Sequence, residues 1–279
     1  MKPWFASLST ATFLMAGVGG GFAVPAAQAA RLPIFPLLRA QQLLARLGYL
    51  PLGWAVRVGG RKISLAASWY APPRGIWTWK RGPAILHTLW TAPGSYNVLT
   101  RGALMTFQRV NGLTATGFLN PATERALSNA WLHRRTDPHG YNYALVDEYY
   151  GSLHPETLTL WHNGRPVLSC PVNTGIAETP TPLGTFPVYL RYYAQTMSGR
   201  TPWGSYYNDP GVPYVNYIDG GVAVHGFIRQ AYGFPQSLGC IELPVADAAI
   251  AWVYLHIGTL VTIVLNAPAG SLAVGSAQR

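Results

Sequence analysis

The sequence is poor in cysteine, in charged residues and in long apolar runs. Only 2 of its 279 residues are cysteine and only 11% are charged, whereas 49% are hydrophobic. Two cysteines are too few for a disulfide scaffold, and such an apolar chain is expected to fold and not to remain disordered. Acidic residues are scarce, because 10 Asp and Glu stand against 20 Lys and Arg. The length favours two domains.

Residues 1–29 have the pattern of a secretory signal peptide. Lys2 precedes an apolar stretch from Phe5 to about Val18, and Ala27-Gln28-Ala29 forms an A-x-A cleavage site. An uncleaved N-terminal anchor is the alternative, and no later segment has the roughly 20 apolar residues of a membrane helix. Removal of this segment leaves 19 basic and 10 acidic residues, a net charge of +9. Outside the cytoplasm, that charge favours anionic polymers such as a bacterial wall. Nucleic acid is not an expected partner, because there is no Lys/Arg-rich run.

Residues 30–132 are predicted to form a small helical domain. Apolar residues recur at helical spacing at Leu37, Leu44 and Leu47 and again at Ala103, Phe107 and Val110. Gly48 is expected to end the first helix, and Asn120 followed by Pro121 is a strong start signal for a third. Residues 51–98, rich in Pro, Gly and Trp, are expected to form loops and short helices.

Two segments of this region resemble the peptidoglycan-binding domain family. They are "RAQQLLARLGYL" (39–50) and "ALMTFQRVNGLTATGFLNPATERAL" (103–127). The resemblance implies a three-helix bundle that binds peptidoglycan. The 51–98 stretch is longer than the family's usual connection.

The pattern changes to strands after a polar, turn-rich linker at residues 133–142, in which His133 and His139 are expected to be solvated. Asn163–Gly164 predicts a hairpin between "ETLTLW" and "PVLSCPV". Further strands are predicted in "GTFPVYLRYY", "YVNYIDGGVAVHG" and "TLVTIVLN", with one helix starting near Pro244. The sequence therefore predicts a multi-domain protein, a small α-helical bundle followed by a mainly β domain at 143–266 and a loose tail at 267–279.

His225 and Cys240 are the residues in this domain with a pattern for nucleophilic catalysis. A cysteine thiolate is a strong nucleophile, and histidine is its usual base. His225 follows a strand-like run, and a loop joining two segments of an antiparallel sheet would bring Cys240 back to it. Two structural alternatives stay open at this point: a buried histidine with an inert thiol, and a disulfide between Cys170 and Cys240. Without that disulfide, Cys170 is expected to be a buried strand thiol.

The "HG" at 225–226 and "SLGCIEL" at 237–243 are similar to the catalytic signature of the L,D-transpeptidase family, whose fold is named after the YkuD protein. The resemblance covers most of 143–266. It implies a β-rich, β-sandwich-like domain that crosslinks peptidoglycan stem peptides 3→3 by cysteine acyl transfer, without cofactor or metal. It also implies roles for five residues: nucleophile for Cys240, general base for His225, imidazole orientation for Gly226, oxyanion donation by the Gly239 and Cys240 N–H groups, and turn shaping for Ser237.

The chain departs from the family at two positions. Leu238 stands where many members have His or Lys, and Glu242 stands where Arg or Asn is usual. A carboxylate there raises the pKa of a nearby thiol, and we expect Arg229, the only charged residue between His225 and Cys240, to offset it.

Aromatic residues upstream are the remaining candidates for substrate binding. Trp203, Tyr206 and Tyr207 are expected either to line a substrate cleft, together with Arg229, or to anchor their loop on the sheet. The expected partner is peptidoglycan at the cell wall, and the alternative functions are an L,D-carboxypeptidase and a non-catalytic wall-binding protein.

Overall fold

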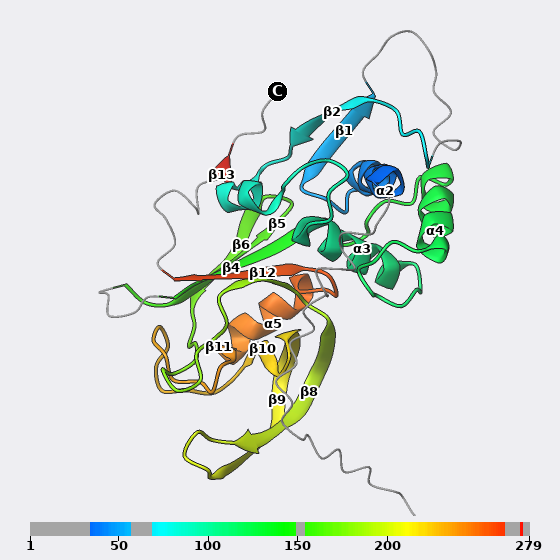
Figure 1. Ribbon diagram of the computed structural model, residues 1–279. Helices are drawn as coiled ribbons and strands as arrows, with labels where there is room; N and C mark the ends of the chain where they lie inside the picture. The colour runs from blue at the N-terminus through cyan, green and yellow to red at the C-terminus, as the bar shows by residue number, and fades with distance from the viewer. Residues whose placement is uncertain (1–33, 57–68, 149–153, 266–273, 276–279) are drawn as a thin grey trace, which may run out of the picture.

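The computed structural model describes residues 34–56, 69–148, 154–265 and 274–275. Figure 1 shows three layers: helices on one side of a five-stranded sheet, and a four-stranded sheet with a further helix on the other side. This mixture of a helical part and a β-rich part is the predicted fold class. The signal peptide predicted at 1–29 lies outside the described residues, and within them no helix has the length and apolarity to cross a membrane.

The helical layer contains the three predicted helices, α2 (Ile34–Leu47), α3 (Val98–Val110) and α4 (Pro121–Leu132). Gly48 follows α2 with φ +94°, a backbone region that favours glycine. Asn120 caps α4 by accepting a hydrogen bond from the Thr123 N–H at 2.9 Å, as its position before Pro121 predicts. The face predicted for α3 is correct for Phe107, which is buried, and wrong for Val110, which is 37% exposed at the end of the helix.

Part of the 51–98 stretch is a β-hairpin, so the expectation of loops and short helices was incomplete. β1 (Leu52–Val56) pairs antiparallel with β2 (Gly75–Trp79), and a 3-10 helix, η1 (Ala84–Leu89), follows β3 (Gly82–Pro83). In the predicted tail, β13 (Val274–Gly275) pairs with β3. The hairpin strands are separated by a long connection, so no local turn signal reveals that they pair.

The central sheet has the strand order β6-β5-β4-β12-β7. Its strands are β4 (Asn142–Glu148), β5 (Thr157–His162), β6 (Arg165–Pro171), β7 (Gly184–Pro187) and β12 (Leu260–Leu265). Asn163 (φ +49°) and Gly164 (φ +75°) form the predicted turn between β5 and β6. β4 and β12 are parallel neighbours at the centre.

Strand alternation in β4 divides the buried residues between two cores. Tyr143 and Leu145 pack with the helices and with β1, whereas Ala144 and Val146 pack against the four-stranded sheet. The helical part therefore packs against one face of the central sheet, and the four-stranded sheet packs against the other.

The four-stranded sheet, with order β11-β10-β9-β8, bears the residues of the catalytic signature. It consists of β8 (Leu190–Arg200), β9 (Tyr206–Asp219), β10 (Val222–Gly226) and β11 (Ile241–Leu243), followed by α5 (Val245–Tyr254). The expectation of antiparallel segments was wrong, because β10 and β11 are parallel. A parallel pair requires a long crossover connection, and residues 227–240 provide it.

The predicted linker is fixed at both ends. The Asp137 N–H donates to the Leu47 carbonyl at 2.8 Å, and the Tyr141 carbonyl accepts from the Asn163 N–H at 2.8 Å. The expectation for His139 was wrong: its ring stacks on His256 with the centroids 3.8 Å apart, because the linker crosses the loop after α5. His133 is exposed, as expected.

Candidate active site

His225 lies in β10, and Cys240 lies directly before the neighbouring strand β11, with both side chains on one face of the sheet. The parallel register places Val224 opposite Ile241 and His225 opposite Glu242. Val224 and Ile241 pack in the core between the sheets, so His225, Glu242 and Cys240, two residues before Glu242, project from the outer face. His225 and Cys240 therefore face the same side of the sheet, with Cys240 two residues before Glu242, the register partner of His225.

The outer face of the sheet has a small apolar cluster of its own. Its buried members are Val212, Val215 and Ala223, and Cys240 and Tyr217 pack against them. These contacts place the thiol on a rigid sheet surface formed by β9 and β10.

The His225 side chain is buried, with 3% of its surface exposed. Its Nδ1 lies 3.0 Å from the Gly226 carbonyl oxygen. A carbonyl only accepts, so Nδ1 donates and Nε2 has the free lone pair in the neutral ring. This is the contact that the resemblance implies for Gly226. Burial lowers the pKa of His225, although the Gly226 carbonyl and Glu242 act in the opposite direction. The imidazole is thus uncharged near pH 7, and its Nε2 can accept a proton.

This shift predicts the pH dependence of acylation. Only neutral His225 accepts a proton, so the acylation rate of the intact protein is expected to fall as pH drops through the lowered pKa of His225, with its midpoint below pH 6.5. From that midpoint to pH 8 the rate is expected to be flat. Single-turnover acylation measured from pH 4 to 9 checks this, and a midpoint above pH 7 contradicts it.

Cys240 is partly exposed, and its Sγ lies 3.8 Å from the Gly221 carbonyl oxygen. Burial raises the pKa of the Cys240 thiol to about 11, and Glu242 adds to the increase, while the Ala223 backbone opposes it. At neutral pH the sulfur is therefore a thiol, so that nucleophilic attack requires a base.

The disulfide alternative was wrong. Both cysteines are free, and Cys170 is buried in β6 within the core between the sheets. Burial raises the pKa of Cys170 to about 12. Cys170 is the buried strand thiol that the sequence predicted.

Ser237 stabilises the turn that ends in Cys240. Its Oγ donates to the Cys240 carbonyl at 2.6 Å and accepts from the Gly239 N–H at 3.1 Å. Gly239 has φ +111°, a backbone conformation that is strained for any residue with a side chain. The Gly239 N–H, predicted to be an oxyanion donor, is engaged by Ser237 in this structure. Thr181, which the sequence did not single out, donates to the Gly239 carbonyl at 3.1 Å.

Arg229 and Glu242 form a bidentate ion pair. Arg229 Nε and Nη2 donate to the two Glu242 carboxylate oxygens, each at 2.7 Å. Only 6% of the Glu242 side chain and 30% of the Arg229 side chain is exposed. The charge of Glu242, placed on the His225 face of the sheet, is thus balanced by the residue that the sequence indicated.

Breaking this ion pair is expected to change both the stability of the fold and the pKa of the Cys240 thiol. Arg229→Ala leaves a buried carboxylate unpaired, which we expect to destabilise the fold by roughly 2–3 kcal/mol and to raise the thiol pKa further. Glu242→Gln is expected to lower the thiol pKa, and the double variant to recover most of the stability. Urea unfolding and pH-dependent alkylation in a Cys170→Ala background measure both. If Arg229→Ala shifts neither quantity, the pair has no such role.

The aromatic candidates separate in space. Tyr207 lies near the thiol: burial and then the charge of Cys240 raise the Tyr207 pKa. Trp203 is 68% exposed in the turn between β8 and β9, and Tyr206 is 75% exposed beside Arg200. The structure thus brings Tyr207, but neither Trp203 nor Tyr206, to Cys240.

Tyr217 is a neighbour of Cys240 that sequence reasoning missed. Burial and then Cys240 raise its pKa to about 12. The only sequence signal for Tyr217 was its place in a strand-like run. Its pairing with Ala223 depends on a β-bulge that cannot be predicted from the sequence. Among the described residues no three His, Cys, Asp or Glu side chains gather as in a metal site.

Comparison with known families agrees with this arrangement. The model of the L,D-transpeptidase catalytic domain, YkuD, matches residues 124–263, half of the chain. The chain therefore belongs to the L,D-transpeptidase catalytic domain family. A second model, described as a peptidoglycan binding domain, matches residues 88–127, so the predicted domain order is confirmed.

Several solved structures are similar to part of the chain. The catalytic domain of the Enterococcus faecium L,D-transpeptidase is 28% identical, with a TM-score of 0.39, over 44% of this chain and 96% of that one. An L,D-transpeptidase from Mycobacterium smegmatis is 22% identical, with a TM-score of 0.38, over 44% of this chain. L,D-transpeptidase 3 from Mycobacterium tuberculosis is 23% identical, with a TM-score of 0.38, over 44% of this chain and 61% of that one. The match spans 59% of the M. smegmatis chain. A search of curated proteins found none that matches this chain.

Proposed function

We propose that the chain is an exported cell-wall enzyme that crosslinks peptidoglycan stem peptides 3→3 by acyl transfer through Cys240. The observation that supports this most is that His225 in β10 and Cys240, directly before the parallel strand β11, are on one face of the sheet, with the imidazole oriented by Gly226. Export to the wall rests on the sequence pattern of residues 1–29 and on the net positive charge.

In the first half-reaction, His225 Nε2 removes the thiol proton as Sγ attacks the carbonyl carbon at the third residue of a stem tetrapeptide. The tetrahedral intermediate then collapses with cleavage of the carbon–nitrogen bond to D-Ala. His225 returns its proton to the departing amine, and a thioester on Cys240 remains.

The second half-reaction transfers the acyl group to a side-chain amine on a neighbouring stem. The amine attacks the thioester carbon and gives a proton to His225, and that proton returns to Sγ as the thioester bond breaks. The Cys240 N–H is the donor we assign to the oxyanion in both steps, since the Gly239 N–H donates to Ser237. A water molecule in place of the amine gives the L,D-carboxypeptidase reaction.

Product masses distinguish these functions. Incubation of the purified protein with stem tetrapeptides is expected to give a crosslinked dimer that has lost one D-Ala. Tripeptide alone would indicate the carboxypeptidase. Unchanged tetrapeptide, with no mass increase at Cys240 from a carbapenem as acyl-donor mimic, together with binding to sacculi, would indicate a non-catalytic wall-binding protein.

A further inference from the structure

A cleft of about 630 Å³ lies where the helical part meets the β-rich part, apart from the face that bears Cys240. Its walls are the end of α3 with the following loop (106–115), the start of β8 (189–193) and the segment that leaves α5 (252–257). In Figure 1, α3 lies on one side of β12, and α5 and β8 lie on the other. We call this the junction cleft.

The junction cleft is on the opposite face of β8 from the thiol. Arg191 pairs with Asn216, and Tyr192 pairs with Val215, which belongs to the apolar cluster around Cys240. Side chains alternate along a strand, so Arg191 and Tyr193 project away from Cys240 and into the junction cleft. A ligand in the cleft therefore does not occupy the catalytic face.

Basic groups line this cleft without an acidic one. Arg109 and Arg191 contribute cations, His139 and His256 contribute rings whose pKa is lowered by burial, that of His256 to about 4, and none of the lining residues is Asp or Glu. Arg109 and Arg191 both line the cleft, and burial and then the nearby Arg109 lower the pKa of Arg191 to about 10. The ion pair of Arg229 with Glu242 lies at another site.

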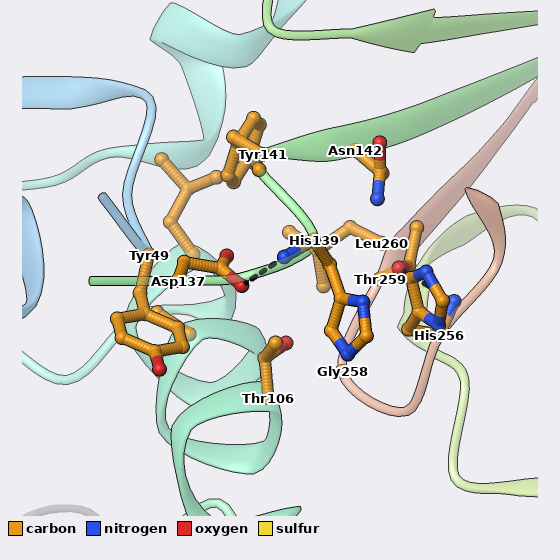
Figure 2. A pocket seen from close by; sticks show the side chains of 13 residues that line it. Tyr49, Thr106, Asp137, His139, Tyr141, Asn142, His256, Gly258, Thr259 and Leu260 are labelled. Carbon is orange, nitrogen blue, oxygen red and sulfur yellow. Dashed lines mark hydrogen bonds between the residues drawn. The ribbon is translucent and has the colours of Figure 1, made fainter. Parts of the chain in front are cut away.

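Figure 2 shows a smaller recess of about 10 Å³ that shares Thr106, His139 and His256 with the junction cleft, and in it the rings of His139 and His256 lie side by side. The Asp137 carboxylate lines this recess. Asp137 accepts a hydrogen bond from the backbone N–H of His139 at 3.0 Å (Figure 2). Burial raises the pKa of Asp137 to about 6, while the charge of Lys80 acts in the opposite direction, and Asp137 does not line the junction cleft.

Arg191 is fixed beside two aromatic rings, the half-buried Trp252 and the exposed Tyr193. Its guanidinium lies 3.6 Å from the Trp252 ring centroid, and it donates to Asn216 Oδ1 at 2.8 Å and to the Trp252 carbonyl at 2.6 Å. Tyr193, 67% exposed, lies edge-on to Trp252 with the ring centroids 6.1 Å apart. A fixed cation beside accessible aromatic faces is suited to a ligand that has both a carboxylate and a ring-shaped, partly apolar surface.

We propose that the junction cleft binds a peptidoglycan strand through a free stem-peptide carboxylate, at Arg109 and Arg191, and an adjoining sugar, at Tyr193 and Trp252. This rests on the proposed function, because peptidoglycan is the polymer that both parts of the chain would meet. One wall of the cleft lies within the match to the peptidoglycan binding domain, and the others lie within the match to the catalytic domain. A strand bound there contacts both parts at once and raises the local concentration of stem peptides around Cys240.

Equilibrium binding of a purified disaccharide-tetrapeptide to full-length Cys240→Ala protein tests the proposal without turnover. Arg109→Gln, at an exposed position, is expected to weaken binding at least about fivefold, and Arg109→Gln with Tyr193→Ala at least about twentyfold. Arg165→Gln, an equal charge change on exposed β6, is the matched control and is expected to have no effect. Amidation of the ligand's carboxylates is expected to reproduce the loss.

The proposal is overturned if Arg109→Gln binds as tightly as Arg165→Gln, if amidation has no effect, or if polyphosphate of equal charge competes as well as the muropeptide. Turnover of free tetrapeptide by the unmodified chain is measured in parallel. Turnover without an Arg109 effect on binding contradicts the junction cleft alone. Arg109-dependent binding without turnover contradicts the acyl transfer and leaves the cleft as a wall-binding site.

Discussion

Replacement of Cys240 by alanine is expected to abolish crosslinking, with a fall in kcat of at least about 10³-fold. The reason is chemical, since the proposed reaction carries the acyl group on the Cys240 Sγ and alanine has no nucleophilic atom there. The side chain removed is small and partly exposed, so the fold is expected to survive. Formation of crosslinked dimers from stem tetrapeptides, followed by mass spectrometry, measures the effect.

Cys170→Ala is the matched control. Cys170 is the second thiol of the chain, but it lies in the core between the sheets, and burial raises the pKa of its thiol to about 12. We expect Cys170→Ala to keep full activity at the cost of roughly 1 kcal/mol of stability. Loss of turnover in well-folded Cys170→Ala, or retained turnover in Cys240→Ala, would assign the reaction to a different nucleophile.

His225→Gln is expected to reduce the acylation rate at pH 7 by about 10²–10⁴-fold. With a thiol pKa of about 11, only about 1 in 10⁴ molecules has a thiolate at pH 7, so attack depends on proton removal by the imidazole. Glutamine keeps a similar volume and polar atoms at this buried position but does not accept the proton.

The same variant is expected to recover activity in alkali. Each unit of pH between 7 and 10 increases the thiolate fraction tenfold, so the acylation rate of His225→Gln should rise about tenfold per unit, while that of the unmodified protein stays nearly flat. Stopped-flow acylation across this range, with circular dichroism to confirm folding, gives both profiles. A His225→Gln profile parallel to that of the unmodified protein would show that His225 does not act as the base.

Local signals in the sequence predicted the features that depend on neighbouring residues. Asn163–Gly164 gave the correct hairpin, and Asn120 with Pro121 gave the correct helix start, because turn and capping geometry involve only a few adjacent residues. The ion pair of Arg229 with Glu242 was also found from charge alone, since no other charged residue lies on the connecting loop.

Long-range pairings were not predictable from the sequence in the same way. The hairpin of β1 with β2, the parallel pairing of β10 with β11 and the position of Tyr217 beside Cys240 all join residues that are distant along the chain. The packing of a different core against each face of β4 was missed for the same reason. The sequence shows that both faces of a strand are apolar, but it does not show which elements cover each face.

Glu242 has a different meaning in the structure than in the sequence. Taken alone, an acid two residues after the nucleophile indicates a weakened or lost site. Paired with Arg229 through two hydrogen bonds, it is a neutralised, buried group that fixes the loop after β10 to β11. We therefore interpret Glu242, in place of the Arg or Asn usual in the family, as a residue that holds the Arg229 guanidinium near the site.

The most direct test of the central claim is the site of the acyl-enzyme. The full-length protein is mixed with a stem tetrapeptide, quenched in acid within the first turnover and digested, and the thioester is located by mass spectrometry. We expect the acyl tripeptide on Cys240, absent in Cys240→Ala and greatly reduced in His225→Gln at pH 7. Crosslinked product formed with no acyl group on Cys240 would contradict it.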